Sequence, residues 1–183
     1  STLDLKKLIP LLALTIIFSI GGAYLLINSS DEFFLQFIPF LILIATLLFL
    51  FNPTSELASV NTSASLPQKI GLSIVSTYGG YFNGGLGIAL LSVLSLGSQF
   101  SLKQMSAVKS LISFLITTVS VCVFLFNGFI VWSYVVYMII FSVLGGFTGA
   151  KLTEVLPTKL VRKFIIFVGL SLSASLIFIG YIK

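Results

Sequence analysis

Long apolar segments constrain this sequence more than any other feature. Five stretches of about 20 mainly apolar residues lie between short polar or glycine-containing breaks, and 57% of the 183 residues are hydrophobic while only 8% are charged. An α-helix needs about 20 apolar residues to cross a bilayer, and inside lipid it satisfies its backbone hydrogen bonds internally. The sequence therefore predicts an all-α fold, a polytopic helical bundle embedded in a membrane.

The apolar stretches predict five membrane-crossing helices and an order of domains along the chain. The helices are expected at residues 8–27, 33–51, 107–126, 129–150 and 164–182. Residues 52–69 are rich in Ser, Thr, Asn and Pro, which is typical of a loop, here a cytoplasmic linker. We expect residues 1–51 to end a first structural repeat and residues 70–183 to form a second. A basic turn is expected at residues 151–163.

Residues 70–96 are apolar but differ from the other segments in their glycine content. Five of the ten residues from Tyr78 to Gly87 are glycines. Each glycine inside a helix costs about 1 kcal/mol relative to alanine, so the cluster predicts an interrupted helix. Two alternatives follow: one bent span, or two half-helices that enter and leave the membrane by the same face.

The distribution of basic residues favours the second alternative. If residues 70–96 crossed the membrane once, four of the ten Lys and Arg residues would lie on one side and six on the other. If the segment is re-entrant, nine share one side, and only Lys183 lies opposite, together with Asp31 and Glu32. Lys and Arg in short loops prefer the cytoplasm. We therefore expect a re-entrant segment whose two ends are cytoplasmic, as are the N-terminus and the turn at 151–163.

A weak internal repeat agrees with this topology. With an offset of 127 residues, Gly22-Ala23 aligns with Gly149-Ala150, and Phe37-Ile38 aligns with Phe164-Ile165. Three crossings separate the two copies if residues 70–96 are re-entrant, so the copies have opposite orientations in the membrane. Inverted repeats with broken helices at their interface are a recurrent transporter architecture.

The glycine run resembles a known family. Residues Tyr78 to Gly87, YGGYFNGGLG, are similar to the motif that opens the second half of the sulfite exporter TauE/SafE family, and Ala107 to Leu111 resemble its next helix. The resemblance implies a multi-pass carrier of the bacterial inner membrane that exports sulfite, organosulfonates or related small anions. It also implies that this sequence is N-terminally truncated. Ser113 stands where the family often has Asn.

The broken segment is also where an anion site is expected. A half-helix that begins near Gly84 would direct free N–H groups and the positive end of its dipole toward a cavity, and both favour an anion. The expected substrate-binding residues are Tyr78, Gly79, Gly80, Tyr81, Asn83, Gly84, Gly85, Gly87, Lys109 and Ser113. The alternative for the glycines is close helix packing, which we favour for Gly145, Gly146 and Gly149. Lys109 is equally explained as a residue that extends to the membrane interface.

The composition favours a transporter over an enzyme or a nucleic-acid-binding protein. The sequence has no histidine, and its five acidic residues lie near segment ends or in loops. We therefore expect no catalytic residues, no metal site and no cofactor, and a transporter rather than an enzyme. The net charge of +5 comes from scattered single residues, which does not indicate nucleic acid as a partner. The expected partners are a small anionic substrate and the lipid bilayer. An anion channel, a non-transporting interaction subunit and a homo-oligomer remain open alternatives.

Overall fold

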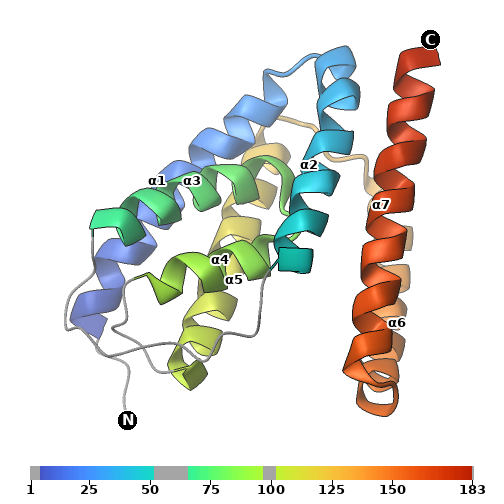
Figure 1. Ribbon diagram of the computed structural model, residues 1–183. Helices are drawn as coiled ribbons and strands as arrows, with labels where there is room; N and C mark the ends of the chain where they lie inside the picture. The colour runs from blue at the N-terminus through green and yellow to red at the C-terminus, as the bar shows by residue number, and fades with distance from the viewer. Residues whose placement is uncertain (1–4, 52–65, 97–101, 183) are drawn as a thin grey trace.

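The computed structural model describes residues 5–51, 66–96 and 102–182, which contain seven α-helices (Figure 1). The helices are α1 (Leu5–Ile27), α2 (Asp31–Phe51), α3 (Leu66–Phe82), α4 (Leu86–Ser95), α5 (Leu102–Phe126), α6 (Trp132–Val155) and α7 (Thr158–Ile182). No strand occurs among the described residues. The predicted all-α class is therefore confirmed.

The composition and length of the helices agree with a membrane protein. Among the described residues, three helical segments are long and apolar enough to cross a bilayer, namely Leu8–Ile27, Gln104–Phe126 and Trp132–Leu152. Large hydrophobic side chains cover much of the outer surface, such as Ile17, Phe114 and Phe141. Such a surface is favourable in contact with lipid chains but not in contact with water.

Five helices, α1, α2, α3, α5 and α7, begin earlier than the sequence pattern predicted. Helix α2 begins at Asp31, because the hydroxyl of Ser30 accepts a hydrogen bond of 3.2 Å from the N–H of Phe33 and so caps the helix. Helix α3 begins at Leu66, so the last residues of the predicted linker, 66–69, belong to the helix. Pro67 is accommodated there because the N–H groups of a first helical turn need no intrahelical acceptor. Residues 52–65 of that linker lie outside the described residues.

The predicted basic turn at residues 151–163 is wrong. Helix α6 continues to Val155 and α7 begins at Thr158, so that only Leu156 and Pro157 connect them. A proline forces the preceding residue out of the helical region, and Leu156 is indeed extended, with φ −84° and ψ 144°. Helix α6 also begins later than predicted, at Trp132, and α5 begins earlier, at Leu102.

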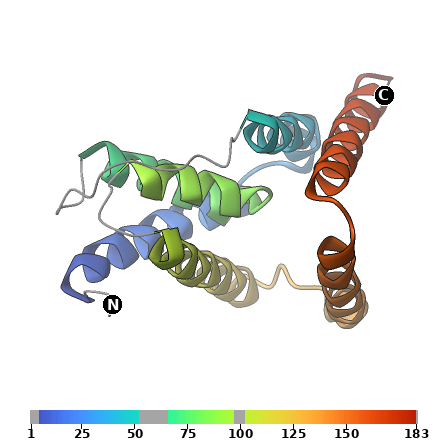
Figure 2. The same cartoon turned by 60° about the horizontal axis from the view of Figure 1, so that its bottom comes forward.

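Helices α1, α3, α4 and α5 pack around one hydrophobic core, and Figure 2 shows them as one group with α6 and α7 set apart. The fully buried side chains include Leu11 of α1, Leu72 of α3, Leu90 of α4 and Ile112 of α5. Each of these helices thus contributes to the same cluster. This four-helix group fixes the position of α3 and α4, which carry the glycine motif.

Small residues allow α1 and α3 to approach closely. A Cβ atom on Gly80 would overlap the backbone carbonyl of Ser19, and one on Gly22 would overlap the carbonyl of Thr77. Inside a membrane, lipid chains are as apolar as the helix surfaces, so the hydrophobic effect does not drive helices together. They associate through close packing of this kind instead. Gly80 and Gly22 therefore set the separation of the two helices.

Helix α7 packs against α2 and not against the four-helix group. The buried hydroxyl of Ser173 donates a 2.8 Å hydrogen bond to the carbonyl of Pro39, and Gly169 lies directly against Thr46. Helix α6 makes no extensive contact with another helix among the described residues. Its glycines, Gly145, Gly146 and Gly149, face open space, so their predicted packing role finds no partner in this part of the protein.

The close contact of Gly80 with α1 is testable with a single methyl group. We expect Gly80→Ala to lower the melting temperature of the detergent-solubilised protein by about 5 °C, because overpacking costs about 1–3 kcal/mol. The matched control is Gly149→Ala, since a Cβ on Gly149 meets nothing within 4 Å. Equal melting temperatures for the two variants would contradict the close approach of α1 and α3.

Candidate functional site

The glycine motif forms a sharp reversal between α3 and α4. Helix α3 ends at Phe82 and α4 begins at Leu86, and Asn83 and Gly85 both have positive φ angles, 35° and 71°. A side chain at Gly85 would be strained at this φ angle, and its Cβ would also lie only 2.8 Å from the Cβ of Ala45 in α2. The interruption predicted from the glycine content is therefore confirmed.

The two half-helices fold back on each other as a hairpin. The side-chain amide of Gln68, at the start of α3, donates a hydrogen bond of 3.3 Å to the carbonyl of Leu94, near the end of α4. A Cβ on Gly71 would lie 3.1 Å from the side chain of Val93. The segment therefore ends beside the place where it begins. With ten residues, α4 is about 15 Å long, half the thickness of a bilayer's hydrocarbon core.

The tip of the hairpin lies level with the middle of two apolar helices. Gly80 lies against Ser19, near the centre of the span Leu8–Ile27. The amide nitrogen of Asn83 lies 3.1 Å from the hydroxyl of Thr117, which is near the centre of the span Gln104–Phe126. Both neighbours indicate the same depth for the reversal.

Side-chain hydrogen bonds hold the backbone of the reversal. The hydroxyl of Tyr78 donates to the carbonyl of Gly84 at 2.5 Å, and the amide of Asn83 donates to the hydroxyl of Thr117. The hydroxyl of Ser120 donates to the carbonyl of Ile116 at 2.9 Å and lies 3.5 Å from the carbonyl oxygen of Gly80. Backbone outside a helix is tolerated at membrane depth only where protein or a polar cavity satisfies it. Tyr78 and Asn83 therefore have structural roles at the reversal.

The first turn of α4 has the features of an anion site. Gly85 is its N-cap, and among the described residues no side chain caps this helix. The first N–H groups of an α-helix have no intrahelical acceptors, and the helix dipole adds partial positive charge at this end. The N–H of Ile88 donates to the carbonyl of Gly85 at 3.0 Å, which leaves the N–H groups of Leu86 and Gly87 available to an anion.

A polar face of α5 lies next to this turn. Lys109, Ser113 and Thr117 are spaced four residues apart and so lie on one side of α5. A Cβ on Gly87 would lie 3.9 Å from Cδ of Lys109, and Thr117 accepts the bond from Asn83. The polar face of α5 that carries Lys109 and Ser113 thus lies beside Gly87 and Asn83. Gly84 and Gly85 lie on the other side of the reversal, toward α2 and α7. Thr117 was not among the expected site residues, although its spacing of four from Ser113 was visible in the sequence.

The remaining expected residues lie elsewhere. The hydroxyl of Tyr81 lies 3.3 Å from that of Ser29, in the turn between α1 and α2, and its ring packs edge-on against Phe34. Gly79 and Gly80 are buried, and side chains there would meet Leu86 of α4 or the backbone of α1. The side chain of Tyr81 therefore extends toward the end of the bundle, and the two glycines lie at helix–helix contacts.

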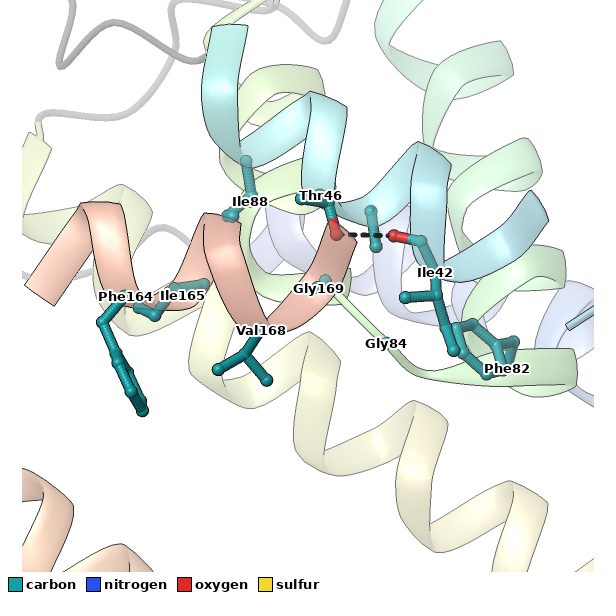
Figure 3. A pocket seen from close by; sticks show the side chains of 11 residues that line it. Ile42, Thr46, Phe82, Gly84, Ile88, Phe164, Ile165, Val168 and Gly169 are labelled. Carbon is teal, nitrogen blue, oxygen red and sulfur yellow. Dashed lines mark hydrogen bonds between the residues drawn. The ribbon is translucent and has the colours of Figure 1, made fainter. Parts of the chain in front are cut away.

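A cavity of about 360 Å³ adjoins the other side of the reversal (Figure 3). Its walls come from α2, the reversal, α4 and α7, and its lining residues include Ala45, Gly84, Gly85, Ile88 and Val168. Sequence reasoning missed this cavity, because no pattern in the chain indicates that α2 and α7 pack together. No group of three or more His, Cys, Asp or Glu side chains that could hold a metal occurs within the described residues.

These features define a helical membrane protein with a broken hairpin at its centre. The particular family follows from sequence comparison: the family model described as Sulfite exporter TauE/SafE matches residues 1–176, and the chain belongs to this family. A Haemophilus influenzae protein named probable membrane transporter protein is 29% identical over 159 residues, which is 84% of this chain. The chain spans 62% of the length of that relative. No solved structure matches.

The bond from Tyr78 to the carbonyl of Gly84 yields a prediction about local stability. We expect Tyr78→Phe to increase amide hydrogen exchange of residues 83–87 about fivefold, because a lost hydrogen bond costs about 1 kcal/mol. Hydrogen–deuterium exchange of the purified protein in nanodiscs measures this. Tyr137→Phe is the control, because Tyr137 lies exposed on α6. Unchanged exchange in Tyr78→Phe would show that Tyr78 does not hold the reversal.

Proposed function

We propose that this protein transports a small anion, sulfite or an organosulfonate, across the bacterial inner membrane and binds it at the first turn of α4. The observation that carries this proposal is the meeting of an uncapped helix N-terminus with the Lys109 side chain beside Gly87. Membership of the sulfite exporter family supports the class of activity and substrate. The name of the Haemophilus influenzae relative supports transport in general.

The proposed topology has five crossings, α1, α2, α5, α6 and α7, with α3–α4 as a re-entrant hairpin between them. Figure 1 supports it: the turn between α6 and α7 lies at the same end of the molecule as the beginning of α5, and the turn between α1 and α2 lies at the opposite end. This arrangement collects basic residues at one end, as the positive-inside rule requires of the cytoplasmic face. An inverted repeat that relates α1–α2 to α6–α7 is part of the same proposal.

The proposed binding mode uses dipoles and a single cation. The N–H groups of Leu86 and Gly87 would donate to the oxyanion, and the ammonium group of Lys109 would compensate its charge. Ser113 and Thr117 line the side of α5 that faces the reversal. A site of this kind holds its ligand by hydrogen bonds and charge and forms no covalent bond to it. We therefore propose a transporter and not an enzyme.

The experiment is efflux of radiolabelled sulfite from proteoliposomes that contain the purified protein. We expect saturable efflux above that of empty vesicles, and saturation distinguishes a carrier from an anion channel. Lys109→Met should raise KM at least about tenfold, because a charge-assisted hydrogen bond is worth about 1.5–3 kcal/mol. Lys109→Arg should retain most of the affinity, because it keeps the charge.

Lys151→Met is the matched control, because Lys151 is exposed on α6 and lies 4.5 Å from the Phe147 ring of the same helix. Its KM should equal that of the unaltered protein. Identical KM values for Lys109→Met and Lys151→Met would remove Lys109 from the site. Efflux no faster than from empty vesicles, for sulfite and sulfonates alike, would contradict the proposed function.

A further inference from the structure

A separate cavity lies at the end of the molecule where α1 turns into α2. Its volume is about 270 Å³, and its walls come from the end of α1, the start of α2, and the end of α5 with the loop that follows it. Figure 1 shows these helix ends together at one end of the molecule. Three of the lining residues are phenylalanines and one is an aspartate, and none of the described lining residues is basic.

The way α5 ends brings two of these phenylalanines to one wall. Gly128 has a φ angle of 71°, and its N–H donates to the carbonyl of Leu125. The N–H of Phe129 donates to the carbonyl of Phe124 at 3.0 Å. These two bonds form a Schellman motif, in which the outermost donor and acceptor residues frequently make a hydrophobic contact. In α5 those residues are Phe124 and Phe129, and both line the cavity.

The start of α2 supplies the third ring and a negative charge. Asp31 is the first residue of α2 and Phe34 follows three residues later, so both lie on one face of its first turn. The ring of Phe34 packs edge-on against Tyr81, with 6.0 Å between the ring centroids, and this contact holds the ring in place. The cavity therefore combines a carboxylate with three aromatic rings.

This combination favours a cation that carries apolar groups. Aromatic rings attract a cation that lies over their faces, and quaternary ammonium ions are bound in proteins by rings grouped in this way. The carboxylate of Asp31 adds attraction for a cation and repels an anion. A Ca²⁺ or Mg²⁺ ion needs about six oxygen ligands, whereas Ser29 and Asp31 alone provide side-chain oxygens among the described lining residues. The hydroxyl of Ser29 already donates to the carbonyl of Leu25 at 2.7 Å.

We infer that this cavity binds an organic ammonium group, of the quaternary kind found in choline, between the carboxylate of Asp31 and the three phenylalanine rings. The group can belong to a free solute or to a phospholipid headgroup, because both offer the same chemistry. The cavity lies at the ends of α1 and α5, whose apolar spans are long enough to cross a bilayer, and this is the depth of lipid headgroups. The inference does not depend on the proposed anion transport, because it concerns another site and a ligand of opposite charge.

The test compares choline with dimethylbutanol, its uncharged analogue in which a carbon atom replaces the nitrogen. Both are titrated by saturation-transfer NMR against the purified protein in phosphatidylglycerol nanodiscs. Choline should bind at least about fivefold more tightly, because the rings and the carboxylate attract only the cation. Asp31→Asn and Phe124→Leu should each weaken choline binding at least about threefold.

Two neighbouring residues provide matched controls. Glu32→Gln removes the acidic group next to Asp31, and Glu32 does not line the cavity. Phe126→Leu removes a ring two residues from Phe124, and Phe126 is 86% exposed and also does not line the cavity. Both variants should bind choline as the unaltered protein does.

Phosphatidylcholine nanodiscs distinguish the two sources of the ammonium group. The quantity compared is the ratio of choline affinities between the unaltered protein and Asp31→Asn, because this ratio cancels the attraction of choline to an anionic lipid surface. A ratio that falls to about one in phosphatidylcholine supports the inference with a lipid headgroup as the ligand, since the headgroup then fills the site. An unchanged ratio supports it with a free solute as the ligand.

Two results in phosphatidylglycerol nanodiscs would overturn the inference. Equal affinities for choline and dimethylbutanol would show that the cavity does not select a cation. Equal effects of Asp31→Asn and Glu32→Gln would show that choline responds to the charge of the surface and not to this cavity. Neither result would affect the proposed anion transport, which sulfite efflux tests separately.

Discussion

The need to satisfy backbone polar groups inside an apolar bundle governs this structure. Three residues between α3 and α4 leave helical geometry at the depth where α1 and α5 are in mid-span. The structure meets this need with Tyr78, which donates to the carbonyl of Gly84, and with Asn83, which donates to Thr117. The close packing of Gly80 against α1 and of Gly85 against α2 follows, because the reversal is stable only where neighbouring helices surround it.

The reversal also lies where two groups of helices meet. Helices α1, α3, α4 and α5 share one core, whereas α7 is held to α2 by Ser173 and by the contact of Gly169 with Thr46. One side of the reversal faces the polar side of α5 and the other faces the apolar cavity. A single short loop therefore separates a polar side, next to α5, from an apolar side, next to α2 and α7.

Much of the fold was predictable from sequence, because apolar length, glycine content and proline are strong local signals. They predicted the helical class and the interruption in residues 70–96, but Pro67 and Pro157 moved helix boundaries that polar composition had suggested. The pairing of α2 with α7 and the cavity between them were not predictable, because core-facing and lipid-facing positions of a membrane helix are both apolar. For the same reason the sequence did not distinguish Tyr78, which contacts the reversal, from Tyr81, which contacts Ser29.

The re-entrant hairpin is the central claim, and labelling of single cysteines in intact cells and in inverted membrane vesicles tests it most directly. Cysteines replace Leu66 and Leu96, the exposed residues at the two ends of the hairpin, and Ser30 in the turn between α1 and α2, with Cys122 changed to alanine. The account predicts that a membrane-impermeant maleimide labels Leu66→Cys and Leu96→Cys only in inverted vesicles and Ser30→Cys only in intact cells. Labelling of Leu66→Cys and Leu96→Cys from opposite sides would contradict it, because α3 and α4 would then cross the membrane.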